Sequence, residues 1–365
     1  MKKLVVLKVL IWLYVLAMII MDIIEISKVL KNVGGSMPTN SMIFLIIIKN
    51  LIPFIILVVI YTILVFIYKK RGVEINKDNN HKLKKTMSTL IHSRVLYVVL
   101  PILVILGFIL SILLIQNQIL YYPHYNEISN FNLSKNTEGR LEELFVDSNE
   151  GRYHGWVYKC SEEADTIVYF GGNAQTSDEW FEYIKNNSER ELYFQYNYVM
   201  IDYPGYSISD GKPGYNSIIS MADTTISYVL NDDYLGNNRI IIMGYSLGTG
   251  VASYVASNNS VDMLILLAPY NNMTEVFNSK MNVFYGPLKY LVRSPFSSDK
   301  YIGDIDASIL IIASKNDEVI PFKLSEKLVD NNSKITFCSL DNVTHTELLT
   351  NIKTKKIIKD YLDQN

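Results

Sequence analysis

The chain has 365 residues, of which 49% are hydrophobic, and its formal charge of −2 at pH 7 favours no particular class of partner. Two cysteines, Cys160 and Cys338, are too few for a disulfide framework and are predicted to be buried free thiols. No internal repeat and no low-complexity linker interrupts the sequence.

Three apolar segments occupy the N-terminal third of the chain, at residues 4–24, 43–68 and 95–115. Each is long enough to cross a hydrocarbon layer of about 30 Å as a helix. The first segment follows Lys2 and Lys3, as in a signal peptide, but it lacks a small-residue cleavage site. We therefore predict that residues 1–118 form a membrane region with three transmembrane helices. Buried helices of a soluble domain are the alternative.

The charges between these segments predict their orientation. The loop 69–94 carries a large excess of Lys and Arg, whereas residues 25–41 and 116–135 carry few. The positive-inside rule then places the loop in the cytoplasm and, after three crossings, the C-terminal domain outside. The Ile-, Asn- and Lys-rich composition favours an AT-rich bacterium, so we predict a multi-pass protein of a bacterial cell membrane. A nucleic-acid patch in the loop is the alternative, but the position beside a membrane span already explains the charge. No nucleic-acid partner is expected.

Two strands are predicted early in the C-terminal part. The run 166–170 is followed by Gly171-Gly172-Asn173-Ala174, and the run 198–203 ends in Pro204-Gly205-Tyr206-Ser207. Glycine frees the backbone to bend, so the N–H of Asn173 can face a site at the end of its strand. A plain turn is the alternative there. The second loop is predicted to be a rigid turn beside the site.

The run Gly244-Tyr245-Ser246-Leu247-Gly248 has the G-x-S-x-G pattern. It lies between a β-branched stretch at 239–243 and a helical stretch at 251–257. Strand, G-x-S-x-G and helix together are typical of a nucleophile elbow, in which a sharp turn exposes the serine hydroxyl. We predict Ser246 as a nucleophile and the N–H groups of Leu247 and Asn173 as the oxyanion hole. A glycine-rich turn without chemistry is the alternative.

A serine nucleophile needs a base and an orienting carboxylate, and in this architecture they follow the serine in the order acid, then histidine. His345 is the one histidine after Ser246, and it follows a predicted strand at 334–340. Asp317 lies in the loop after a predicted strand at 308–314, with Glu318 as its adjacent competitor. Between the two halves, residues 270–303 depart from strand–helix alternation. They are predicted to form a small cap whose apolar side lines an acyl pocket; a helix packed on the sheet is the alternative.

These motifs together resemble the α/β-hydrolase superfamily. They are GGNA at 171–174, DYPGYS at 202–207, GYSLGTG at 244–250, ND-x-x-IP at 316–321 and TH at 344–345. The resemblance covers residues 120–362 and is greatest to the membrane-anchored, serine-aminopeptidase-like branch, which has an LYYP-type entry, here Leu120–Pro123. Relatives in that branch read His-Gly-Asn-Ala where this chain has Gly171–Ala174.

The resemblance implies a mostly parallel sheet with helices on both faces, at residues 119–365. It also implies Ser246 as nucleophile, Asp317 as acid, His345 as base, and Asn173 and Leu247 as oxyanion donors, with neither metal nor organic cofactor. The expected activity is hydrolysis of ester or thioester bonds in an acylated or lipid substrate beside the bilayer. A peptidase of the same fold, a catalytically silent binding module on a membrane anchor, and a transport or sensing component are the alternatives.

Overall fold

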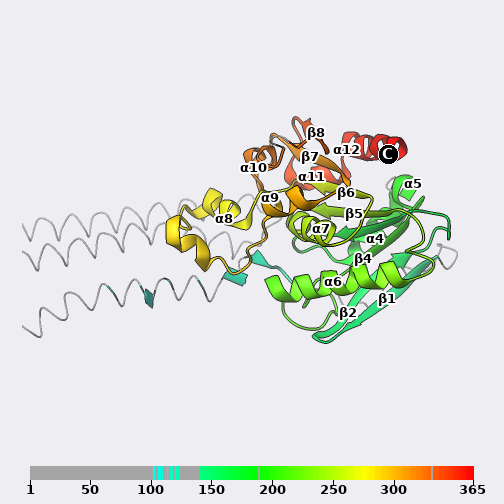
Figure 1. Cartoon of the computed structure of the whole chain (residues 1–365), viewed down its shortest axis with the longest axis horizontal. Coiled ribbons are helices and arrows are strands. Elements are labelled where there is room, and N and C mark those ends of the chain that lie inside the picture. The colour runs from blue at the N-terminus through cyan, green and yellow to red at the C-terminus, as the bar shows by residue number, and fades with distance from the viewer. Residues whose placement is uncertain are drawn as a thin grey trace, which may run out of the picture. The chain divides into compact units, whose positions relative to one another are not determined.

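A computed structural model describes residues 140–187, 190–329 and 332–365, the segment 120–123, and the single positions 102, 106, 107, 109, 113, 116 and 117. The chain divides into two compact units, residues 1–115 and 116–365, and the elements below belong to the second (Figure 1). The predicted spans 4–24 and 43–68 and most of 95–115 lie outside the described residues. Within the described part, no helix combines the length and apolar character that a membrane crossing requires.

An eight-stranded sheet forms the centre of the second unit. Its strands are β1 (Leu141–Ser148), β2 (Gly151–Tyr158), β3 (Thr166–Phe170), β4 (Asn197–Ile201), β5 (Ile240–Tyr245), β6 (Met263–Leu267), β7 (Ser308–Ser314) and β8 (Ile335–Leu340). They lie in the order β1-β2-β4-β3-β5-β6-β7-β8. β2 is antiparallel to both of its neighbours, and the remaining pairs are parallel. The mostly parallel sheet predicted from the sequence is confirmed.

Helices connect the strands of this sheet. They are α4 (Ser177–Asn186), α5 (Arg190–Tyr193), α6 (Tyr215–Asn231), α7 (Leu247–Asn258), α8 (Met273–Met281), α9 (Ser298–Tyr301), α10 (Phe322–Glu326), α11 (His345–Thr350) and α12 (Ile352–Gln364), with short 3₁₀ turns η2 (Gly286–Leu291) and η3 (Ile302–Asp304). Buried side chains of α4, α5, α11 and α12 share one core cluster with alternate residues of the strands. The opposite face carries α7, which packs on β3, β5 and β6, with α6 beside it (Figure 1).

Burial on both faces explains the composition of the central strands. Every residue of β3, β4, β5 and β6 is buried. Strands covered by helices on both sides are continuously apolar, whereas strands with one wet face alternate. The β-branched and leucine-rich runs in the sequence therefore correspond to strands that are buried on both faces. Cys160 and Cys338 are free, as predicted, but only partly buried.

The parallel strands bring several loops to one edge of the sheet. Because the carboxyl ends of parallel strands meet at the same edge, the loops after β3, β5, β7 and β8 are neighbours, and ligands of open α/β sheets bind at that edge. α7 begins at Leu247, four residues before the helix predicted there. Its first turn can do so because Gly248 has no side chain: a Cβ would lie 2.0 Å from the carbonyl oxygen of Phe170.

Candidate active site

Ser246 lies in a strained turn between β5 and α7. Its φ of 51° and ψ of −116° are unusual for a residue with a side chain, and such strain persists only where the surroundings hold it. The backbone N–H of Ser246 donates to the carbonyl oxygen of Leu267 at 2.9 Å, and its carbonyl oxygen accepts from the N–H and hydroxyl of Thr249. These hydrogen bonds hold the Ser246 hydroxyl at the edge of the sheet, where the residue is 7% exposed.

His345 is the first residue of α11 and contacts both predicted partners. Its Nε2 lies 2.9 Å from Ser246 Oγ, and its Nδ1 lies 2.7 Å from Asp317 Oδ2. Thr344 caps the helix through a reciprocal capping box with Glu347. The imidazole also stacks on the ring of Tyr245, whose hydroxyl donates to the carbonyl oxygen of His345 at 2.9 Å. These contacts fix both the backbone and the ring plane of the histidine.

The structure distinguishes the two carboxylates in the loop after β7. Asp317 Oδ1 accepts the N–H groups of Val319 and Ile320 at 2.9 and 2.7 Å, which leaves Oδ2 for the imidazole. Glu318 instead accepts from the backbone N–H of His345 at 3.1 Å. Asp317 is thus the partner of the ring and Glu318 a partner of the backbone.

The loop after β3 lies beside the serine. A Cβ on Gly172 would be 3.7 Å from the Cβ of Ser246 and 2.8 Å from the ring of Tyr245, so glycine permits this approach. Asn173 follows in the same loop, and Leu247 opens α7. Within the described residues, neither backbone N–H has a hydrogen-bond acceptor of its own. Both are free to donate to a ligand.

The side chain of Asn173 has contacts that the sequence reasoning missed. Its Oδ1 accepts from the backbone N–H of Tyr122 at 3.1 Å, from the Tyr206 hydroxyl at 2.8 Å and from the backbone N–H of Ala174 at 3.1 Å. Its Nδ2 donates to the carbonyl oxygen of Leu120 at 2.7 Å. The LYYP entry and the DYPGYS motif, which contains Tyr206, therefore both hydrogen-bond to the carboxamide of Asn173.

A second buried polar cluster lies around His154 on β2. Its Nδ1 is 2.8 Å from Asp202 Oδ2, and its Nε2 is 3.2 Å from Glu143 Oε1. Burial lowers the pKa of His154, but the hydrogen bond to Asp202 and the charges of Asp202, Asp178 and Glu143 outweigh it and raise the pKa. Burial raises the pKa of Asp202 although His154 and Ser177 donate to its carboxylate.

His154, Asp178 and Asp202 present atoms close enough to hold a metal ion. Their oxygens, however, already have donors: Ser177 and His154 for Asp202, and Trp156 and Ser207 for Asp178. A metal ion would have to displace these hydrogen bonds. The cluster therefore joins β2, β4 and α4 as a structural network. The sequence analysis did not identify it because the partners of His154 are distant in sequence.

The cap segment shows an apolar base and an exposed tip. Phe284 is buried and packs on Phe277 with ring centroids 5.4 Å apart, whereas Tyr285 is exposed. The cavities in the described part of the chain include one of about 380 Å³ lined around Ile302 and Lys334 and one of about 520 Å³ lined around Phe145 and Tyr228. Neither borders Phe284 or Ser246, so the acyl pocket stays a prediction.

Comparisons with known proteins agree with this architecture. The family model described as "alpha/beta hydrolase fold" matches residues 165–290. The alpha/beta hydrolase domain-containing protein WAV2 of Arabidopsis thaliana is 26% identical over 56% of this chain and 72% of its own length. The lysophosphatidylserine lipase ABHD12 of Danio rerio is 27% identical over 57% of this chain and 60% of its own length.

Among solved structures, the esterase Pf2001 of Pyrococcus furiosus superposes with a TM-score of 0.54 at 15% identity, over 67% of this chain and 98% of its own. Est1E from Butyrivibrio proteoclasticus superposes with a TM-score of 0.50 at 13% identity, over 61% of this chain and 98% of its own. At these identities the superpositions establish the fold. The sheet order agrees with that fold. The family model and the relatives identify the chain as a member of the α/β-hydrolase superfamily.

Proposed function

We propose that this α/β hydrolase is a serine hydrolase that cleaves ester or thioester bonds through an acyl-enzyme. The observation that carries the proposal is the continuous chain of contacts from Asp317 through His345 to Ser246, at 2.7 and 2.9 Å. A serine hydroxyl becomes nucleophilic when a base removes its proton, and a buried carboxylate fixes the tautomer of that base. Among the described residues, Asp317 is the hydrogen-bond partner of Nδ1 of His345 and Ser246 that of Nε2.

In the proposed reaction, Ser246 Oγ attacks the carbonyl carbon of the substrate while its proton passes to His345 Nε2. The electron pair of the carbonyl bond moves to oxygen, where the N–H groups of Leu247 and Asn173 donate to it. The intermediate collapses as the alcohol or thiol leaves with the proton from Nε2. Water then repeats both steps on the acyl-enzyme and restores the serine. Each oxyanion donor in such a site contributes about 3–4 kcal/mol to the transition state.

The substrate class is proposed from the relatives and from the N-terminal sequence. One relative is named a lysophosphatidylserine lipase, and a structural neighbour is named an esterase. The apolar segments 4–24, 43–68 and 95–115 would tether the domain to a membrane, with the domain on the extracytoplasmic side. An acylated or lipid substrate in the bilayer suits that arrangement.

A substrate panel tests the proposal against a peptidase of the same fold. The full chain in detergent should hydrolyse p-nitrophenyl esters and acyl thioesters, with a Ser246-dependent burst of the first product. Aminoacyl p-nitroanilides should react much more slowly. The reverse order would assign a peptidase, and no turnover of any member would assign a silent binding module. The matched control is Ser253→Ala, because Ser253 is a buried serine of α7, the helix that Ser246 precedes, and its hydroxyl donates to the carbonyl oxygen of Thr249.

A further inference from the structure

The cap segment Tyr285–Tyr290 holds large apolar side chains in solvent. Tyr285 is 59% exposed, Leu288 38% and Tyr290 80%. The base below them is fixed, since the side chain of Asn278 both accepts from the N–H of Phe284 and donates to its carbonyl oxygen. Figure 1 shows α8 and the yellow segment after it projecting beyond the sheet. We call Tyr285, Leu288 and Tyr290 the cap patch.

The charged residues in the sequence around the cap segment have one sign, although Lys280 also contacts the loop of Asp317 and Glu318, where its Nζ donates to the carbonyl oxygen of Glu318 at 3.0 Å. No Asp or Glu occurs from residue 276 to 298, whereas Lys280, Lys289 and Arg293 are cationic. The ammonium group of Lys289 lies 5.1 Å from the ring centre of Tyr290. Tyrosines with apolar and basic neighbours are the residues that concentrate at the boundary between lipid and water, where basic groups meet anionic headgroups. The composition therefore fits a bilayer surface better than an acidic or basic protein partner.

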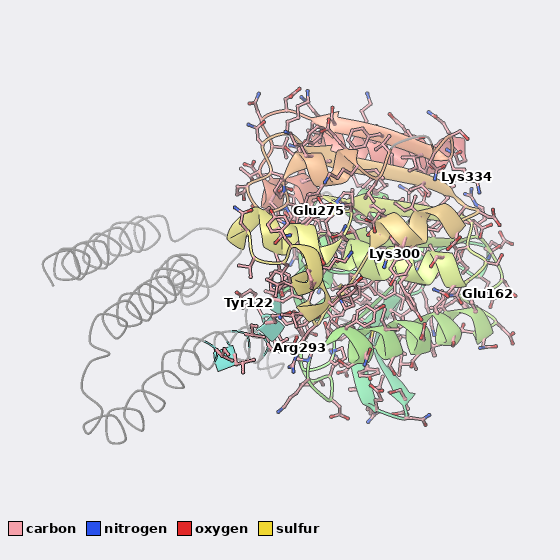
Figure 2. All side chains as sticks on the ribbon, turned by 60° about the vertical axis from the view of Figure 1, so that its left-hand side comes forward. Tyr122, Glu162, Glu275, Arg293, Lys300 and Lys334 are labelled. Carbon is pink, nitrogen blue, oxygen red and sulfur yellow. The ribbon has the colours of Figure 1, made fainter. Side chains whose placement is uncertain are left out.

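The residues that follow the cap patch hydrogen-bond to Gln116, the first residue after the predicted third span. Gln116 Nε2 donates to the carbonyl oxygen of Leu291 at 2.8 Å, and its Oε1 accepts the N–H of Arg293 at 2.8 Å. Gln116 is buried and follows the predicted span 95–115 directly in the sequence. The entry segment contacts the same stretch, since the Tyr121 hydroxyl donates to Ser294 Oγ at 2.8 Å; Figure 2 labels the neighbouring residues Tyr122 and Arg293. We propose that the cap patch rests in the lipid interface of the anchoring membrane, an inference that depends on the anchor of the proposed function.

Bromolipid quenching tests the contact. Tyr290→Trp is made in the full chain and compared with Tyr234→Trp, whose site lies beside Lys159 at the opposite edge of the sheet. Both proteins go into vesicles of phosphatidylcholine and phosphatidylglycerol brominated high on the acyl chains. The fluorescence of the tryptophan introduced at position 290 should be quenched by the bromolipid, whereas that of the tryptophan introduced at position 234 should not. Equal quenching at both positions, or quenching at neither, would overturn the inference, as would burial of position 290 by a second copy at rising protein concentration.

A second readout separates this inference from the proposed chemistry. Tyr290→Ser should lower hydrolysis of a vesicle-borne acyl lipid several-fold and leave hydrolysis of a water-soluble p-nitrophenyl ester unchanged. If the wild-type chain hydrolyses neither the vesicle-borne lipid nor the soluble ester, the proposed function is refuted. The quenching experiment then still tests whether the cap patch contacts lipid. If Tyr290→Ser slows both substrates equally, the cap patch acts on the catalytic site and the lipid contact is refuted.

A separate observation concerns the carboxamide of Asn173. It joins the loop after β3 to Leu120 and Tyr122 on the entry segment and to Tyr206 after β4. The loop it holds is strained, since Ala174 has a φ of 63°. We infer that the Asn173 side chain is a positioning residue: by holding the entry segment and the loop together, it aims the Asn173 backbone N–H at the oxyanion. The LYYP motif then belongs to the catalytic architecture and is more than a connector.

A tetrahedral inhibitor tests this role, which also depends on the proposed function. Tyr206→Phe removes one hydrogen bond to the carboxamide and also the hydroxyl that accepts from the backbone N–H of Tyr122 on the entry segment. Tyr254→Phe, which removes a hydroxyl contact with Asp223, is the matched control. A boronic acid binds serine as a tetrahedral adduct whose oxygen needs the oxyanion donors. Tyr206→Phe should lower kcat and boronate affinity by the same factor, about tenfold, with KM unchanged.

A merely structural role for Tyr206 would give another pattern. Loss of folded protein would lower the active fraction and leave the boronate affinity of the remainder unchanged, which would refute the positioning role. An effect on KM alone would refute it as well. If the wild-type chain forms no boronate adduct, the proposed function itself is refuted. That result comes from the wild type alone and does not depend on the variants.

Discussion

Gly248→Ala tests the packing that places Ser246. A Cβ at this position would lie 2.0 Å from Phe170 O and 2.6 Å from Gly171 O, whereas ordinary contact begins at 3.4 Å. Both atoms belong to the backbone, so no side-chain rotation can relieve the overlap. The first turn of α7 and the end of β3 must separate by about 1.4 Å, the difference between 3.4 and 2.0 Å, to restore ordinary contact. Overpacking of this kind costs about 1–3 kcal/mol, and a 1 Å displacement of reacting groups costs roughly 100-fold in rate.

The matched control is Gly303→Ala, because a Cβ at Gly303 meets nothing within 4 Å. In urea unfolding, the free energy of unfolding of Gly248→Ala should be lower than that of the wild type by about 1–3 kcal/mol. That of Gly303→Ala should change by less than about 0.5 kcal/mol. Hydrolysis of a p-nitrophenyl ester should fall about 100-fold in the first variant and stay at the wild-type level in the second. A Gly248→Ala protein with wild-type stability and rate would refute the packing argument.

The remaining predictions concern the two histidines. Asp317→Asn should lower kcat by about 10⁴-fold because the ring loses the partner that fixes its tautomer. Glu318→Gln should have a far smaller effect because an amide oxygen can still accept the His345 N–H; equal losses in steady-state assays would contradict these assignments. For His154, the pKa is raised in the folded state. Protonation of His154 therefore stabilises the fold fully below the ordinary pKa of about 6.5, and this contribution disappears as pH rises through the folded-state pKa. The unfolding free energy of the wild type minus that of His154→Gln should be constant well below about pH 6.5 and should fall as pH rises above about 6.5. A difference that stays constant across that range would exclude the linkage.

The central strands and the elbow could be predicted because their signals are local. β3 and β7 have the bounds that the sequence indicated, since a strand buried on both faces is a continuous apolar run between turn residues. The strained turn at Ser246 could be placed because G-x-S-x-G lies between a strand and a helix. His345 and Asp317 could be paired with Ser246 because parallel strands deliver their following loops to one edge.

Contacts between distant polar side chains outside the set Ser246, His345 and Asp317 could not be predicted. His154 meets Asp202 and Glu143 because β2 is antiparallel to β1 and β4, an arrangement that the sequence reasoning did not identify. The carboxamide of Asn173 likewise joins segments that no local pattern connects. The spans at 4–24, 43–68 and 95–115 stay a prediction, and so do the catalytic roles of the residues brought together here.

Covalent labelling tests the central claim most directly. The full chain is treated with a fluorophosphonate, which phosphonylates a serine activated by a neighbouring base, and the modified peptide is mapped by mass spectrometry. A single adduct on Ser246 is expected, with labelling abolished in Ser246→Ala and strongly slowed in His345→Gln. An adduct at another serine, or equal labelling of the wild type and Ser246→Ala, would contradict the account.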